Sequence, residues 1–173
     1  MTGRPVVIVG LMGAGKTSVA TRVAAALGRP LRDSDADLRA RYGQDAATQA
    51  ARYGPEVLHA REARVLRDAL AARDGPAPVV AAAASVVEDP ASRRALDGAF
   101  VVWLDAPARV LAGRMRGGAH RPHYQPDLEA MLATQGRHRA PLYAEVADLT
   151  VDVTATTPDQ AAGTVLAALR ARA

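Results

Sequence analysis

The chain has 173 residues and a mass of 18.0 kDa, which fits one domain with a single hydrophobic core. Its net charge is +4, but the arginines alternate with acids along the predicted helices and aromatic residues make up only 3%, which disfavours a nucleic-acid-binding surface. The absence of cysteine excludes disulfides and thiolate chemistry. The apolar run near the N-terminus is too short for a signal peptide or a membrane span, so we expect a cytoplasmic protein without a membrane partner.

The first predicted elements form a strand, a loop and a helix. Residues 6–9 are all apolar and predict a strand buried on both faces, as in a parallel sheet. The apolar pattern from Lys16 to Leu27 predicts a helix that ends at Gly28. Between them lies GLMGAGKT, residues 10–17. This context is the one that a phosphate-binding Walker A loop requires.

Each part of this loop suits the binding of ATP with Mg²⁺. Its glycines allow positive φ and a close approach of backbone N–H groups to phosphate oxygens. Lys16 would reach the β- and γ-phosphates, and Thr17 would bind Mg²⁺. Lys16 is also the only lysine in the chain, so a composition that otherwise uses arginine has kept lysine here. The expected nucleotide-binding residues of the loop are Gly13, Ala14, Gly15, Lys16, Thr17 and Ser18.

Two strand ends offer a carboxylate for the metal ion. At the first, Asp33 and Asp35 stand at a corner between strand and helix, where one could serve a metal and the other a substrate. The alternative is that Ser34 or Asp35 only caps the helix that follows. At the second, Asp105 ends an apolar strand, but it lies two residues before Pro107, where capping of the next helix explains it adequately. We therefore favour Asp33 as the metal ligand.

The rest of the chain alternates strands with helices. This pattern predicts a three-layer α/β fold with a parallel sheet, right-handed crossovers and a site at the carboxyl ends of the strands. The segment GGAHRP, residues 117–122, is flexible and basic in character and suggests a lid. Further helices are expected at about residues 45–53, 56–73, 89–96, 107–116 and 126–143 and from 158. Further strands are expected at 100–105 and 149–153, and residues 79–87 read as a strand that runs into a loop.

These features together resemble the shikimate kinase family over nearly the full length of the chain. The resemblance rests on the loop at residues 10–17, the paired Asp33 and Asp35, the Arg-Pro pair at Arg121 in the lid, and the RAPLY motif at residues 139–143. It implies a cytoplasmic, monomeric, ATP-dependent kinase of aromatic amino acid biosynthesis. The enzyme would transfer the γ-phosphate of ATP to a hydroxyl of shikimate or of a related hydroxylated small molecule.

The resemblance also implies the fold and its divisions. It predicts a P-loop kinase fold like that of nucleoside monophosphate kinases, with a five-stranded parallel sheet in the order 2-3-1-4-5 and a flexible lid. One domain would span residues 1–173, with the lid at about 117–126 and the acceptor-binding region at about 34–75.

Residue roles follow from the same resemblance. Lys16 and Thr17 would bind ATP and magnesium, and Asp33 would assist the metal. Asp35 would hold the substrate hydroxyl as a candidate general base, and Arg121 would clamp the transferring phosphate. Phosphoryl transfer needs mainly positioning and neutralisation of charge, which these groups could supply.

The acceptor half of the predicted site departs from the family. Arg139 would pair with a substrate carboxylate and Arg114 would pack on adenine, both as in the family. His59, however, stands where the family places a second carboxylate-binding arginine, and it offers one donor per ring nitrogen instead of a planar fork. A partly buried histidine without a substrate role is the alternative. The residues Ala83, Ala84 and Ser85 replace three glycines, so we expect them to narrow the pocket or restrict the loop.

Two other functions remain as alternatives. The chain could be a catalytically impaired, shikimate-kinase-like nucleotide-binding protein with a regulatory or interaction role, which the altered acceptor residues favour and the retained Lys16, Asp35 and Arg121 oppose. Nucleic-acid binding, suggested only by a sequence pI near 10.1, is the least favoured.

Overall fold

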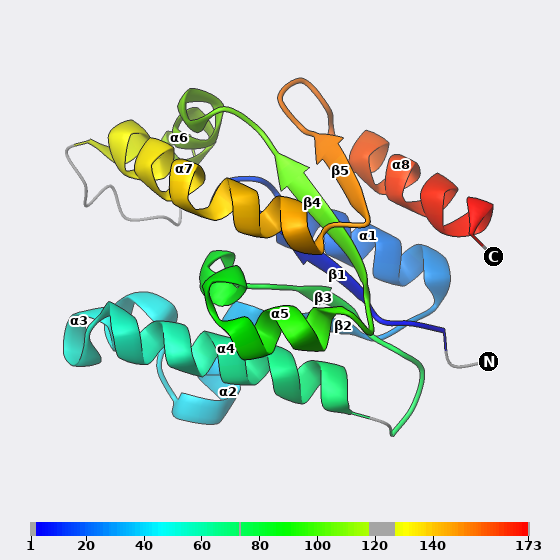
Figure 1. Ribbon diagram of the computed structural model, residues 1–173, viewed down its shortest axis with the longest axis horizontal. Helices are drawn as coiled ribbons and strands as arrows, with labels where there is room; N and C mark the ends of the chain where they lie inside the picture. The colour runs from blue at the N-terminus through cyan, green and yellow to red at the C-terminus, as the bar shows by residue number, and fades with distance from the viewer. Residues whose placement is uncertain (1–2, 73, 118–126, 173) are drawn as a thin grey trace.

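The computed structural model of the protein describes residues 3–72, 74–117 and 127–172, and its strands and helices alternate as predicted (Figure 1). The strands are β1 (Val6–Val9), β2 (Leu31–Asp33), β3 (Val79–Ala81), β4 (Phe100–Asp105) and β5 (Leu149–Asp152). The helices are α1 (Lys16–Leu27), α2 (Ser34–Tyr42), α3 (Ala46–Tyr53), α4 (Pro55–Ala71), the 3₁₀ helix η1 (Ala84–Glu88), α5 (Pro90–Leu96), α6 (Ala108–Arg116), α7 (Leu128–Val146) and α8 (Pro158–Ala171).

The five strands form one parallel sheet in the order β2-β3-β1-β4-β5, which confirms the expected order. β1 is central because its register pairs Val6 with Val79 of β3 and with Phe100 of β4. β2 pairs Asp33 with Ala81 at the end of β3. The loops that follow β1, β2 and β3 therefore leave the sheet at the same edge.

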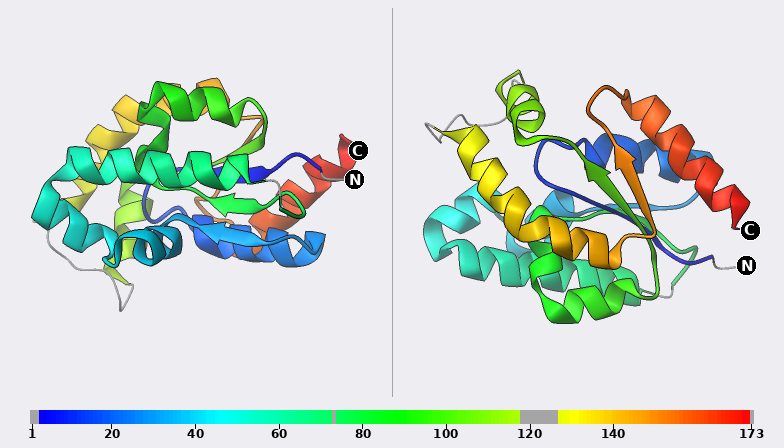
Figure 2. Two further views of the ribbon diagram at one scale, coloured as in Figure 1. Left: turned by 90° about the horizontal axis from the view of Figure 1, so that it is seen from below. Right: turned by 45° about the horizontal axis from the view of Figure 1, so that its top comes forward.

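Helices cover both faces of the sheet and make the three expected layers (Figure 2). α1 and α8 contact each other on one face, and α4 and α5 contact each other on the other face, where α7 also packs against β4. Within the described part of the chain, no helix is both long enough and apolar enough to cross a membrane.

The core is built mainly from alanine, valine and leucine, as the low aromatic content predicts. All four residues of β1 are completely buried, as expected for a central parallel strand with helices on both faces. The one tryptophan, Trp103 of β4, stacks on Tyr143 of α7 with ring centroids 5.6 Å apart. This pair joins α7 to the sheet.

Residues 79–87, predicted as a strand that runs into a loop, form a short strand followed by a 3₁₀ helix. The strand ends at Ala81, Ala82 still donates its N–H to Ile8, and the chain then turns into η1. Val86 and Val87 of η1 are as buried as strand residues. A continuous apolar run therefore did not distinguish the strand from the buried 3₁₀ helix that follows it.

Candidate active site

A cavity of about 840 Å³ lies at the edge of the sheet where β1, β2 and β3 end. Its lining comes from the loop after β1, the β2–α2 corner, the segment after β3, one face each of α3 and α4, and parts of α6 and α7. The cavity is large enough for a substrate beside the glycine-rich loop. It therefore joins the predicted nucleotide half and the predicted acceptor half of the site in one space.

The glycine-rich loop has the geometry of an anion cradle. Gly15, the N-cap of α1, has φ 88° and no side-chain cap, so the first N–H groups of α1 remain available to a ligand. Gly13 has φ 83°, and a Cβ there would lie 2.9 Å from the carbonyl oxygen of Leu111. Lys16 Nζ donates to the carbonyl oxygens of Gly10 (2.9 Å) and Leu11 (3.1 Å), which holds the ammonium group over the loop.

Asp33 connects this loop to the acceptor side. One oxygen, Oδ2, accepts a 2.6 Å hydrogen bond from the Thr17 hydroxyl, while Oδ1 accepts from the backbone N–H groups of Asp35 (3.0 Å) and Ala36 (3.4 Å). The N-cap of α2 is thus Asp33, and the suggestion that Ser34 or Asp35 caps this helix is wrong. Capping by Asp33 leaves Asp35 on the first turn of α2, where it lines the cavity.

The Thr17 and Asp33 oxygens fit a magnesium ion. Mg²⁺ prefers oxygen ligands and usually takes only one or two from the protein, the remainder coming from water and phosphate. Thr17 and Asp33 supply two such oxygens, 2.6 Å apart, beside the glycine-rich loop.

Asp105, the second candidate for the metal ion, lies outside the cavity and does not cap the next helix. Helix α6 begins without a side-chain cap, so the expectation that Asp105 caps this helix is wrong. Its partner across the sheet is Asp152, at the end of β5. Burial, followed by the charge of Asp152, raises the pKa of Asp105. The structure thus supplies no reason to prefer Asp105 to Asp33 as a metal ligand.

The acceptor half contains a carboxyl group that the sequence analysis missed. Glu62 of α4 is 8% exposed, lines the cavity and accepts a hydrogen bond from Ser85 Oγ. Burial raises the pKa of Glu62; the Ser85 hydrogen bond opposes this shift and the charge of Asp35 adds to it. Glu62 is four residues from both Leu58 and Leu66, which are buried, so helical periodicity alone could have placed it inward.

The segment that replaces three glycines has ordinary backbone geometry. Ala83 has φ −64°, and no described non-glycine residue has a positive φ. Ser85 is buried with its hydroxyl toward Glu62, and the Ala84 carbonyl accepts a 2.7 Å hydrogen bond from the Tyr143 hydroxyl. The segment is therefore fixed from behind, and its residues line the cavity.

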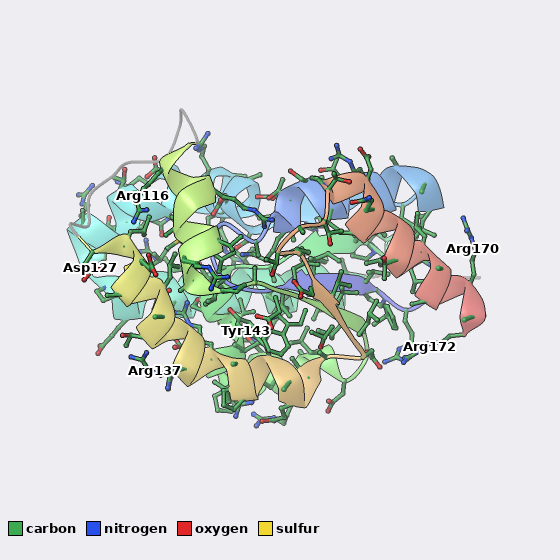
Figure 3. All side chains as sticks on the ribbon, turned by 90° about the horizontal axis from the view of Figure 1, so that it is seen from above. Arg116, Asp127, Arg137, Tyr143, Arg170 and Arg172 are labelled. Atoms are coloured by element: carbon green, nitrogen blue, oxygen red, sulfur yellow. The ribbon has the colours of Figure 1, made fainter. Side chains whose placement is uncertain are left out.

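Replacing Tyr143 by phenylalanine should destabilise this wall of the cavity. Figure 3 shows Tyr143 turned inward from α7, while Arg137 of the same helix lies on the outer side. Tyr143→Phe leaves the Ala84 carbonyl without its partner, so we expect a loss of about 1–3 kcal/mol in the free energy of unfolding. Chemical denaturation of the two proteins measures this. An unchanged denaturation midpoint and slope would contradict this prediction and show that water replaces the tyrosine hydroxyl without loss of stability.

Arg139 and His59 both lie next to the carboxylate of Glu88. Arg139, with 6% of its side chain exposed, donates from Nε to Glu88 Oε1 (3.2 Å) and from Nη1 to Gln135 Oε1 (3.3 Å). His59 Nδ1 lies 3.7 Å from Glu88 Oε2. Arg61 takes no part in this group, because its guanidinium donates to Gln49 and lies against the rings of Tyr42 and Tyr53.

His59 predicts a pH-dependent affinity for anionic acceptors. Burial, and then the charge of Arg139, lower the pKa of His59 below its usual 6.5, against the opposing effect of Glu88. The imidazolium therefore forms only on the acid side of that value, and affinity for an anion should rise as the pH falls through this range. Titrating shikimate at several pH values, in the wild type and in His59→Ala, measures the effect. Identical profiles in the two proteins would exclude a contact between His59 and the anion.

Two of the predicted site residues that the structure describes, Ala14 and Arg114, do not line the cavity. The guanidinium of Arg114, on α6, donates to the carbonyl oxygen of Val153, just after β5. Arg121 and the predicted lid at about 117–126 lie almost entirely outside the described residues, between Arg116 and Asp127 (Figure 3).

Comparisons with known proteins agree with this geometry. The family model described as "Shikimate kinase" matches residues 12–170. A shikimate kinase of Paramagnetospirillum magneticum is 38% identical over 159 residues, covering 91% of this chain and 80% of the relative. A shikimate kinase of Halorhodospira halophila is 41% identical over 149 residues, covering 85% of this chain and 82% of the relative. The solved structure of the Acinetobacter baumannii shikimate kinase in complex with shikimate superimposes with a TM-score of 0.90 at 27% identity, covering 99% of this chain and 95% of that one.

Proposed function

The chain belongs to the shikimate kinase family, and from this premise we propose that it transfers the γ-phosphate of ATP to a hydroxyl group of shikimate or of a closely related hydroxylated small molecule. It is thus a phosphotransferase with an alcohol acceptor. The observation that supports this most directly is the single cavity lined by Lys16, Thr17, Asp33, Asp35 and Arg139. Nucleotide-binding and acceptor-binding groups that are far apart in the sequence meet there.

The loop and the start of α1 would hold the nucleotide. Bound Mg·ATP supplies the transferable phosphoryl group and a metal ion that neutralises its charge. The N–H groups of the loop and of the first turn of α1 would bind phosphate oxygens, and Lys16 would leave the loop carbonyls to reach the β- and γ-phosphates. Thr17 and Asp33, already in contact, would hold the magnesium ion between them.

The acceptor half would orient the hydroxyl and accept its proton. Asp35 would accept the hydroxyl proton as the oxygen bonds to the γ-phosphorus and ADP leaves, and Glu62 would hydrogen-bond a second hydroxyl of the acceptor. Arg139, His59 and the wall of Ala83, Ala84 and Ser85 would contact the far end of the acceptor. Since the cavity is lined by several fixed elements, most of the rate enhancement would come from positioning.

Three further roles complete the proposal. Arg114, held by the Val153 carbonyl, would present its side chain to the adenine, and Arg121 of the lid would clamp the transferring phosphate. The protein would act as a cytoplasmic monomer on a small molecule, without nucleic acid. We do not favour a catalytically impaired module, because the catalytic groups and the cavity beside them are both retained.

The proposal is tested by ADP formation from Mg·ATP with and without saturating shikimate. We expect ADP release to depend on the acceptor, on magnesium and on Lys16, with Lys16→Ala as the blank. Mass spectrometry of the product would show one added phosphoryl group on the acceptor. Nucleotide binding without any acceptor-dependent ADP, over a panel of hydroxylated acids and polyols, would refute it.

A further inference from the structure

Glu88 does not itself line the cavity, but its carboxylate pairs with two residues that do, Arg139 and His59. It ends η1, and its side chain lies 3.2 Å from Arg139 Nε, 3.3 Å from His138 Nε2 and 3.7 Å from His59 Nδ1. Arginine is the only one of these partners whose side chain is charged at every ordinary pH. The permanent positive charge at this end of the cavity is therefore already balanced by the protein.

Within this group Arg139 is shielded from water, while 28% of the Glu88 side chain is exposed. Arg139 is almost wholly buried, and burial reduces the screening of the charges around it. Besides Glu88, it contacts Gln135 through Nη1. An acceptor carboxylate that approached Arg139 would have to share the guanidinium with Glu88, and the two like charges would repel each other at short range.

No other described group in the acceptor half supplies a permanent positive charge in place of the one that Glu88 balances. The carboxyl groups of Asp35 and Glu62 line the same part of the cavity, and burial works against the charged form of His59. The other basic side chains among the described lining residues are Lys16, in the phosphate-binding loop, and Arg116, at the end of α6. Their positive charge lies with the nucleotide half.

We propose that Glu88 is a specificity-determining residue: it disfavours acceptors that carry a carboxylate at Arg139 and selects those whose group at this position is uncharged, such as a hydroxymethyl group. This inference rests on the proposed function, since it concerns the acceptor in the same cavity. A hydroxyl oxygen accepts a hydrogen bond from the guanidinium without adding a second negative charge beside Glu88. Shikimate is then a substrate of low affinity for this enzyme, and its uncharged relatives bind better.

A matched pair of ligands tests this directly. Shikimate and its counterpart with a hydroxymethyl group in place of the carboxylate share the same ring and hydroxyls. Calorimetric titration of the full chain with a non-hydrolysable ATP analogue gives both dissociation constants without turnover. We expect the wild type to bind the hydroxymethyl compound at least tenfold more tightly, and Glu88→Gln to shift the ratio at least tenfold toward shikimate by strengthening shikimate binding.

Glu145→Gln is the matched control. Glu145 pairs with Arg93 Nε at 3.3 Å, so the variant removes the same charge from a similar pair, and neither residue lines the cavity. We expect its ratio to equal that of the wild type. Tighter binding of shikimate by the wild type, an unchanged ratio in folded Glu88→Gln, or no binding of either ligand by either protein would overturn the proposal.

The wild-type ratio needs no variant, so the test does not depend on the folding of Glu88→Gln. Turnover of the same two compounds separates this inference from the function on which it rests. Binding with the expected ratio, but without phosphorylation, would refute the kinase function and leave the selective role of Glu88 in place. Phosphorylation with a clear preference for shikimate would support the kinase function and refute the selective role of Glu88.

Discussion

Lys16→Ala is expected to lower kcat by about a thousandfold or more, because one fixed positive charge on the transferring phosphate supplies stabilisation of this order. This corresponds to about 4 kcal/mol of transition-state stabilisation. The ammonium group already lies over the loop, held by the carbonyls of Gly10 and Leu11, so it needs only a short movement to reach a phosphate. Steady-state ADP release, with nucleotide affinity measured separately, assigns the loss to binding or to chemistry.

Two companion variants make this result specific. Arg22→Ala removes a positive charge from the same helix, where Arg22 pairs with Asp159 at 2.6 Å outside the cavity, and should leave the rate unchanged. Lys16→Arg keeps the charge but replaces a compact ammonium by a planar fork, and we expect little recovery. Near-normal turnover in Lys16→Ala would contradict the assigned role of the loop.

Asp35→Asn is expected to lower kcat by about 10²–10⁴-fold with a smaller effect on KM, because an amide of the same shape cannot take the hydroxyl proton. Asp35 lies on the first turn of α2, which Asp33 caps, so the substitution leaves the cap and the Thr17 contact in place. Pre-steady-state measurement of the first turnover would place the loss in the chemical step.

Asp37→Asn serves as the control for this change. Asp37 is on the same helix and pairs with Arg32 at 2.8 Å outside the main cavity, so its loss should affect stability slightly and kcat not at all. Wild-type kcat in Asp35→Asn, combined with a large loss in Glu62→Gln, would move the role of general base to Glu62.

The sheet could be predicted from the sequence because its signals are local. Residues 6–9 and 100–104 are uninterrupted apolar runs, and the glycines after the first run mark the loop without reference to the rest of the chain. The order of the strands is not a local property. It was expected from the family resemblance, and the structure confirms it.

The acceptor half could be predicted only in part, because its chemistry depends on contacts between distant segments. Glu62 and Ser85 are 23 residues apart, and Glu88 and Arg139 are 51 apart. A glutamate on a helix ordinarily faces water, so its residue type argued against an inward position for Glu62, although its spacing from Leu58 and Leu66 favoured one. Nothing near Glu88 in the sequence indicated its pairing with Arg139. Asp33 is expected to bind the metal, and its other oxygen also caps α2. The spacing of the aspartates alone could not show that one residue has both roles.

The stacking of Trp103 on Tyr143 gives the protein a built-in optical reporter. Trp103 is the only tryptophan, and its neighbour Tyr143 holds the Ala84 carbonyl in the wall of the cavity. A ligand that shifts this wall also shifts the tyrosine ring against the indole, which changes the emission of a single fluorophore. If acceptor binding moves this wall, the change in Trp103 emission would let acceptor association be followed on the unlabelled enzyme without a coupled assay.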